Sequence, residues 1–137
     1  MGKLPDLAML ANPYVPFQLE DPPKYEPRRA LVRGTLYPGL DLPFHGMVNK
    51  QEKPVTPMTE LQVLAFAIQE LALYLDTHRD DQEALELYRS YQKLYHKCMK
   101  EYTKKRGPLT HKTPTEEGPY AWLDDPWPWE YCKNKEA

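Results

Sequence analysis

The segment DTHRDD, at residues 76–81, gathers the side chains with the greatest capacity for metal binding or proton transfer: Asp76, His78, Asp80 and Asp81. Carboxylate and imidazole groups this close together can bind a cation. Aspartates in a polar turn more often cap a helix and face solvent. The sequence therefore offers a cation site and a capped turn as alternatives, and the capped turn is the commoner of the two.

Nucleophilic chemistry has less support still. Cys98 and His96 are two residues apart, so on a helix they point about 200° away from each other and cannot form a nucleophile–base pair. Cys98 also falls on an apolar stripe, where a small buried side chain is typical. No glutamate has histidine three residues later, and phosphate-binding, serine-hydrolase and zinc-protease motifs are absent from the sequence. We expect no catalytic residue, no metal site and no cofactor, and hence no enzyme.

The charge balance argues against polyanionic partners. The chain has 18 Lys and Arg against 20 Asp and Glu, which gives no general attraction to nucleic acid or to an anionic membrane. A basic run near residues 97–106 suits the C-terminus of a helix. No stretch reaches the ~20 apolar residues of a membrane span, and the start MGKLPDLAML lacks the features of a signal sequence. We expect neither a membrane span nor nucleic-acid binding.

A helix is predicted to begin after Thr56, a good N-cap, with Pro57 at the first helical position. Apolar residues then recur at spacings of three and four, the period of a bundle helix. The members of this stripe are Leu61, Leu64, Ile68, Leu71 and Leu75. The helix is about 20 residues long and ends in the polar turn at residues 76–81.

A second helix of about 27 residues is predicted to follow that turn. Asp80 is the expected N-cap, with Glu83 completing a capping box, and Gly107 with Pro108 marks the end. Its apolar stripe is narrow and consists of Ala84, Tyr88, Tyr91, Tyr95, Cys98 and Tyr102. The two helices are expected to form an antiparallel hairpin.

The first helix is apolar nearly all round, which is typical of a buried helix. The polar residues between positions 61 and 75 are Gln62, Gln69 and Glu70. The apolar residues that fall well away from the main stripe are Val63, Phe66, Leu73 and Tyr74. Because one hairpin partner cannot cover both sides, the helix needs a second copy, the chain's own flanking segments or another protein, and we favour another protein.

The placement of proline separates the middle of the chain from its two ends. Of 15 prolines, ten lie in residues 1–57, none in 58–106 and five in 107–137, so long regular elements are confined to the middle. We expect residues 1–46 to be extended apart from two helical turns over Pro27 to Arg33, ended by Gly34. Residues 47–56 form a linker and residues 108–137 a tail rich in tryptophan and proline. The predicted fold is mainly α: an antiparallel helical hairpin over residues 57–107, flanked by proline/aromatic-rich extended arms.

Aromatic side chains in both arms are candidate protein contacts, because extended aromatic segments fold onto partner surfaces and tryptophan is a frequent interface anchor. Pro126 and Pro128 should make two tryptophans project from a stiff segment. Alternatively, the tail folds back over the first helix. Together with the four residues of that helix, the candidate interaction residues are Tyr14, Phe17, Tyr37, Phe44, Val63, Phe66, Leu73, Tyr74, Trp122, Trp127 and Trp129.

Two stretches resemble two different families. Residues 7–46, with LAMLANPYVPFQ and YEPRRALVRGTLYPGLDLPF, resemble the spore-coat CotJA family. Residues 58–131 resemble the CotJB family through LYLDTH (73–78), DDQEAL (80–85), RGPL (106–109) and PWPWE (126–130). Arg79 stands where the family turn usually has proline, although a cap remains. Members of the two families are normally separate short proteins of one operon, so the chain resembles a fusion.

The resemblance implies a structural component of the bacterial endospore coat, made in the mother cell. It also implies association with other coat proteins, above all a third operon product that resembles a manganese catalase and carries the metal and the chemistry. The alternative is an accessory adaptor that helps the catalase to load or mature. The formation of a homo-oligomer stays open.

Overall fold

The computed structural model describes residues 15–44, 54–113, 119–127, 129 and 130. Within these residues the chain is mainly helical and contains no strand, which confirms the predicted fold class. The elements in order are α1 (Pro27–Arg33), the 3-10 turn η1 (Pro38–Leu40), α2 (Pro57–Thr77), α3 (Gln82–Arg106) and the 3-10 turn η2 (Ala121–Leu123). Tyr14, one of the candidate interaction residues, lies outside the described residues.

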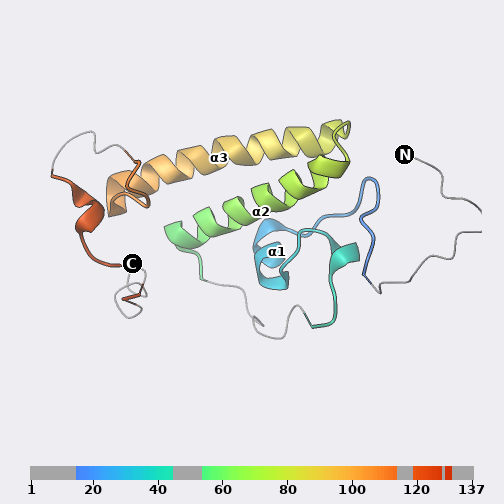
Figure 1. The fold of residues 1–137 in the computed structure, drawn as a ribbon, viewed down its shortest axis with the longest axis horizontal. Coiled ribbons are helices and arrows are strands. Elements are labelled where there is room, and N and C mark those ends of the chain that lie inside the picture. Colours follow the sequence, from blue (N-terminus) through green and yellow to red (C-terminus); the bar gives the residue numbers. More distant parts are fainter. Residues whose placement is uncertain (1–14, 45–53, 114–118, 128, 131–137) are drawn as a thin grey trace, which may run out of the picture.

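Helices α2 and α3 form the predicted hairpin and lie side by side (Figure 1). α2 begins as expected, with Pro57 at the first helical position and the Thr56 hydroxyl accepting a hydrogen bond from the Thr59 N–H at 3.1 Å. Gly107 is the C-cap that follows the last residue of α3, Arg106, as expected, and its positive φ of 99° favours glycine.

The start of α3 corrects the sequence prediction by one residue. Asp81, rather than Asp80, is the N-cap, because its carboxylate accepts a hydrogen bond from the Ala84 N–H at 2.9 Å. The same carboxylate accepts a bond from the Tyr74 hydroxyl at 2.8 Å. A tertiary contact from α2 therefore selects between the two adjacent aspartates, and the Asp80 side chain is left 99% exposed.

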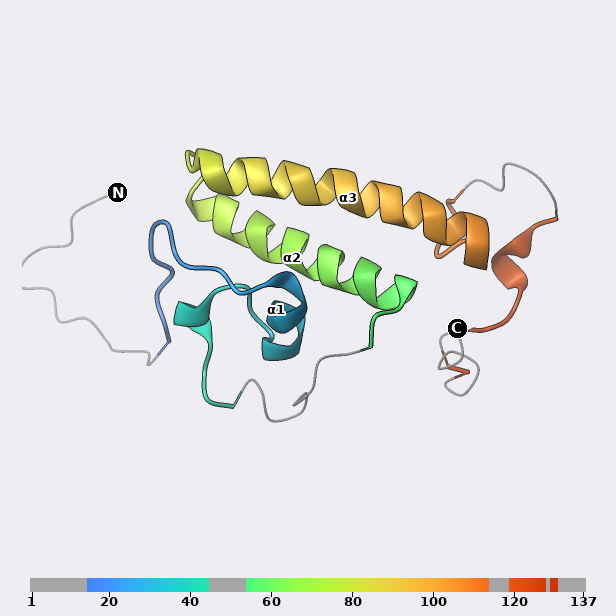
Figure 2. The same ribbon diagram turned by 180° about the vertical axis from the view of Figure 1, so that it is seen from behind.

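The N-terminal segment packs on the face of α2 that α3 leaves open. α1 contacts α2, and two opposite views place it on the other side of α2 from α3 (Figure 1 and Figure 2). α2 is thus the middle layer of the molecule. We call residues 25–41, which contain α1 and η1, the N-terminal cover.

The core lies between the N-terminal cover and the hairpin. The largest fully buried side chains are Leu36 and Tyr37 of the cover and Leu71 of α2. The other buried members of this cluster are Ala30, Tyr74 and Ala84. The CotJA-like and CotJB-like stretches therefore share this buried cluster.

This arrangement decides what covers the second side of α2. Val63 and Tyr74 are buried, and Phe66 packs against the core cluster. The prediction that α2 needs a second cover is confirmed. The expectation that another protein supplies it is wrong, because the chain's own cover does so, and Leu73 alone of these four stays exposed.

The cover is folded, which differs from the expectation of an extended arm. Helix α1 matches its prediction, since it spans Pro27–Arg33 and Gly34 follows as its C-cap with a φ of 81°. The Glu26 carboxylate caps it by accepting hydrogen bonds from two backbone N–H groups of the first turn. The Tyr25 N–H donates to the Leu36 carbonyl at 2.8 Å. The chain therefore doubles back after α1.

By length and composition alone, α2 is apolar enough to cross a membrane, and it is the one such helix in the described part of the chain. The expectation that no stretch reaches this threshold is therefore wrong. The core helix of a compact protein has the same composition. α2 packs on α3 and on the cover, and Glu70 in its second half receives hydrogen bonds from the cover. Internal packing thus covers part of its apolar surface, and 39% of its most apolar 18-residue window is buried.

The three tryptophans of the tail pack on one another instead of projecting separately. The rings of Trp122 and Trp127 meet edge to face with centroids 6.1 Å apart, and those of Trp127 and Trp129 stack at 5.0 Å. The backbone of η2 does not come close to that of α2. This element therefore does not fold back over the helix, unlike the N-terminal cover.

Candidate interaction surfaces

Glu70 is the polar anchor between the hairpin and the N-terminal cover. Its carboxylate accepts hydrogen bonds from the Leu36 N–H at 3.0 Å and from the Thr35 hydroxyl at 3.2 Å. The Thr35 hydroxyl oxygen in turn accepts the Tyr37 N–H at 3.2 Å. Thr35 and Leu36 are buried, so their polar groups need a partner within the protein. One charged side chain of α2 therefore fixes the backbone of the cover where its largest apolar residues enter the core.

Tyr74 links α2 to two other segments. Its ring lies against that of Tyr37, with centroids 5.3 Å apart, and stacks on His78 at 4.3 Å. Its hydroxyl donates to the Asp81 carboxylate at 2.8 Å and accepts the Asp21 N–H at 3.2 Å. The start of α3 and the chain leading into the cover are thus joined through one phenol group.

Both partners of the Tyr74–Asp81 hydrogen bond have shifted acidities. The Ala84 N–H and the Tyr74 hydroxyl, both donating to the carboxylate, lower the pKa of Asp81. Burial, together with the bond to Asp81, raises the pKa of the Tyr74 phenol. Because the carboxylate stays charged and the phenol neutral near neutral pH, the pair is a fixed structural link.

The DTHRDD segment is a capped turn. Asp81 caps α3, and His78 Nδ1 lies 2.8 Å from the Thr77 hydroxyl and 3.3 Å from the Tyr74 carbonyl oxygen. In the described part of the chain, no group of three or more His, Cys, Asp or Glu side chains is arranged to hold a metal ion. The contacts favour the capped turn over the cation site.

An ionic clasp closes the cover on itself. The Arg33 guanidinium donates to both oxygens of Asp41, at 2.6 and 2.8 Å, in the bidentate geometry that is strongest for such pairs. The Tyr25 hydroxyl also donates to Asp41, at 2.9 Å, and this bond raises the pKa of Tyr25. The Asp41 side chain is only 7% exposed. Contacts within the cover therefore join its beginning, its helix and its end.

The candidate interaction residues differ greatly in exposure. Those buried by the chain itself are Tyr37, Val63 and Tyr74. Those half-buried are Phe66, Trp122 and Trp127. Those exposed are Phe17, Phe44, Leu73 and Trp129, at 78%, 61%, 55% and 75%. The last group presents large apolar surface to solvent, whereas the first group makes its contacts inside the protein.

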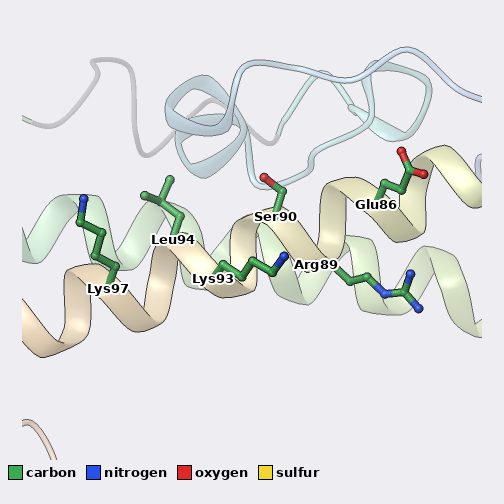
Figure 3. Close-up of a pocket in the computed structure, with 6 residues that line it drawn as sticks. All are labelled: Glu86, Arg89, Ser90, Lys93, Leu94 and Lys97. Atoms are coloured by element: carbon green, nitrogen blue, oxygen red, sulfur yellow. The ribbon is translucent and has the colours of Figure 1, made fainter.

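A surface hollow runs along α3 (Figure 3). Its lining residues are Glu86, Arg89, Ser90, Lys93, Leu94 and Lys97. All six belong to one helix, so the hollow is an open helix face that does not surround a small molecule. Burial along α3 is light in general: Cys98, expected to be buried, is half-buried.

The sequence patterns did not identify the polar groups that join the N-terminal cover to the hairpin. Glu70 appears in the sequence as the only charged residue in the apolar stretch 61–75. A charge in such a position needs a polar partner, and that requirement is the signal that could have found it. Thr35 and Leu36, which satisfy Glu70, lie 35 and 34 residues away. Nothing local in the sequence pairs them.

Comparison with known families explains the two-part organisation. The model of the CotJB protein family matches residues 56–130, which include both helices of the hairpin and most of the tail. The model of the spore coat associated protein JA (CotJA) matches residues 9–44, which include the N-terminal cover. No curated protein and no solved structure matches the chain. The chain therefore belongs to the CotJB protein family and carries a CotJA segment before it, so that it is a fusion of two spore-coat families.

Proposed function

We propose that the protein is a non-enzymatic structural component of the bacterial endospore coat, made in the mother cell, and that it helps to assemble the coat by binding neighbouring proteins. Its membership of two spore-coat families supports the coat role. The main partner in this proposal is a manganese-catalase-like coat protein of the same operon. Other coat proteins and a second copy of the chain are further proposed contacts.

The observation that carries the binding role is a set of large apolar side chains outside a completed core. The cover and α3 already pack on two sides of α2, yet Phe17, Phe44, Leu73 and Trp129 stay more than half exposed. Removing such surface from water is favourable, and exposed aromatic residues are frequent interface anchors. The four residues lie in three separate parts of the chain. This distribution suits contacts with more than one neighbour.

The use of the polar groups supports a non-enzymatic role. Glu70 holds the cover, Asp81 holds the start of α3, and Asp41 holds Arg33 and Tyr25. General acid–base catalysis requires a group that can exchange a proton with a substrate. These three carboxylates are instead engaged in the hydrogen bonds that maintain the fold.

A pull-down from sporulating cells tests the proposed contacts. Replacing Trp127→Ala and Trp129→Ala together should weaken capture of the catalase-like protein about tenfold or more, because aromatic anchors dominate binding energies. Leu94→Ala, which removes an exposed apolar side chain from α3, is the matched control and should capture it normally. Unchanged capture by the double variant would show that the tail is not an anchor.

Quantification in washed, mature spores distinguishes a permanent component from a maturation factor. A structural component should remain in the coat at a level close to that of the catalase-like protein. A factor that only helps the catalase to mature should be scarce there while abundant in the mother cell during sporulation. The second result would replace the structural role by the accessory one.

A further inference from the structure

We infer that the α2 face around Glu70, Leu71 and Tyr74 is a binding site for CotJA-type segments, filled here by the chain's own N-terminal cover and able to take the same segment from another chain. This inference concerns how the two halves recognise each other. It goes beyond the proposed coat function and does not depend on which third protein the molecule binds.

Contacts within the cover restrict its shape. The Glu26 cap, the clasp of Arg33 with Asp41 and the Tyr25–Leu36 backbone hydrogen bond all lie within residues 25–41. A segment that holds its shape through its own contacts loses less conformational entropy on binding. The cover can therefore be recognised as a unit.

The contact between the cover and α2 has the composition of a specific protein interface. Leu36 and Tyr37 provide apolar anchors that are 1% and 2% exposed. They pack against Leu71 and Tyr74. Glu70 recognises the backbone of the cover through the Leu36 N–H, in addition to its bond with the Thr35 hydroxyl. Apolar anchors surrounded by a few directional hydrogen bonds are typical of protein–protein binding sites.

The two halves correspond to two separate families. The CotJA model ends at residue 44 and the CotJB model begins at residue 56, so each half corresponds to a family of its own. Within the described residues, hydrogen bonds that join the halves come from residues 21, 35 and 36 on one side and from α2 on the other. Joining the two halves in one chain raises the effective concentration of the cover at the hairpin.

Cleavage of the full-length protein between its halves tests the inference. A recognition sequence for a specific protease is inserted between Val48 and Asn49, and the purified chain is cut to completion. Gel filtration with light scattering at low micromolar concentration should show both pieces eluting together at the mass of the uncut protein. Separation of the wild-type pieces would overturn the inference, because the cover would then depend on the covalent link.

Two pairs of variants in the cut protein locate the site. Leu36→Asp places a charge at a buried position and should release the cover, whereas Leu19→Asp makes the same change at a position that is 65% exposed and should retain it. Glu70→Ala removes the acceptor of two hydrogen bonds and should speed dissociation about tenfold or more. Gln69→Ala, an exposed neighbour on α2, should not. Retention of the cover by both Leu36→Asp and Glu70→Ala would assign the binding to another surface.

Exchange between chains tests whether the site accepts a cover from outside. Cut protein of natural isotope content is mixed with an equal amount of cut, isotopically heavy protein, unfolded together in urea and refolded. Native mass spectrometry should show light covers on heavy hairpins and the reverse in statistical proportion. Unmixed or unpaired pieces after refolding would overturn the inference.

Discussion

Tyr37 and Tyr74 lie next to each other in the core, yet their hydroxyl groups are in opposite situations. The Tyr74 hydroxyl has two hydrogen-bond partners, Asp81 and the Asp21 N–H. The Tyr37 hydroxyl is buried without a hydrogen-bond partner among the described residues. Burial raises the pKa of the Tyr37 phenol strongly, so this group stays neutral. At the scale of single residues, the two phenols contribute to stability with different signs.

Removing each hydroxyl separately tests this contrast. Tyr37→Phe should leave the free energy of unfolding unchanged or raise it by about 1 kcal/mol, because an unsatisfied polar group is removed. Tyr74→Phe should lower it by about 1–2 kcal/mol, because the Asp21 N–H and the Asp81 carboxylate each lose a partner. Urea unfolding followed by circular dichroism measures both. An equal loss of unfolding free energy in the two variants would contradict the contrast between the two hydroxyl groups.

Asp81 and Asp80 provide a second residue-scale comparison. Asp81→Ala should cost about 1–2 kcal/mol, because it removes the N-cap of α3 and the acceptor of Tyr74. Asp80→Ala should change the free energy of unfolding by less than about 0.5 kcal/mol, because this side chain is almost fully exposed. Chemical denaturation at neutral pH measures the difference. A larger loss of unfolding free energy in Asp80→Ala than in Asp81→Ala would show that Asp80 is the N-cap, as the sequence predicts.

The pH dependence of the Asp81 contribution follows from the direction of its pKa shift. The pKa of Asp81 in the folded protein lies below its ordinary value of 3.8. The carboxylate therefore stabilises the fold above that ordinary value, and this stabilisation is lost as the pH falls through the lower, folded pKa. The free-energy difference between wild type and Asp81→Ala should shrink accordingly in acid. A constant difference from neutral to strongly acidic pH would contradict the shift.

At the scale of elements, the N-terminal cover depends on how its short helix ends. Seven residues form α1, too few to be stable alone, so its caps and its packing must hold it. Gly34 lets the chain turn back at a φ of 81°, in the left-handed region that other residues adopt at a cost. The turn brings Thr35 and Leu36 to the Glu70 carboxylate of α2.

A pair of glycine substitutions separates backbone conformation from packing. Gly34→Ala should lower the free energy of unfolding by about 1–2 kcal/mol through the left-handed φ alone, since a new Cβ there meets nothing within 4 Å. A new Cβ at Gly39 also has no atom within 4 Å, and the φ of Gly39 lies outside the left-handed region. The control Gly39→Ala should be neutral or stabilising by up to about 1 kcal/mol. Thermal and urea unfolding of both variants measure the effect, and a neutral Gly34→Ala would contradict it.

At the scale of the whole molecule, the CotJA segment and the CotJB hairpin are one folding unit because they share a core. Leu71 contributes to the same cluster as Ala30, Leu36 and Tyr37 of the cover. Small single-domain proteins with one core usually unfold in one cooperative transition. We therefore expect the cover and the hairpin to lose their structure together.

Substitutions of two leucines of α2 test whether the cover and the hairpin unfold together. Leu71→Ala should lower the free energy of unfolding by about 2–5 kcal/mol, because it opens a cavity between the two halves. Leu73→Ala, on the same helix but 55% exposed, should lower it by less than about 1 kcal/mol. Far-ultraviolet circular dichroism reports the helices, and near-ultraviolet circular dichroism reports the packing of the aromatic side chains. Two separate transitions in the wild type would show that the halves fold independently.

The local parts of the fold are determined by the sequence itself. Thr56, Pro57 and Gly107 mark helix ends because capping depends on a residue and its immediate neighbours. The same holds for α1 between Pro27 and Gly34. Apolar spacing gives the two long helices, and the family motifs give the two halves, because each is a pattern within a short stretch of chain.

Only the tertiary structure decided what those elements contact. The all-round apolar character of α2 predicts a second cover but cannot identify it, since burial is non-directional and any apolar surface would satisfy it. The choice of Asp81 over Asp80 depends on the Tyr74 hydroxyl, and the role of Glu70 depends on Thr35 and Leu36. Tyr74 and Asp81 meet across the turn of the hairpin. Thr35 and Leu36 are distant from Glu70 in sequence, so they meet it only when the cover folds onto α2. For this reason the hairpin could be predicted from the sequence, whereas the cover that completes its core could not.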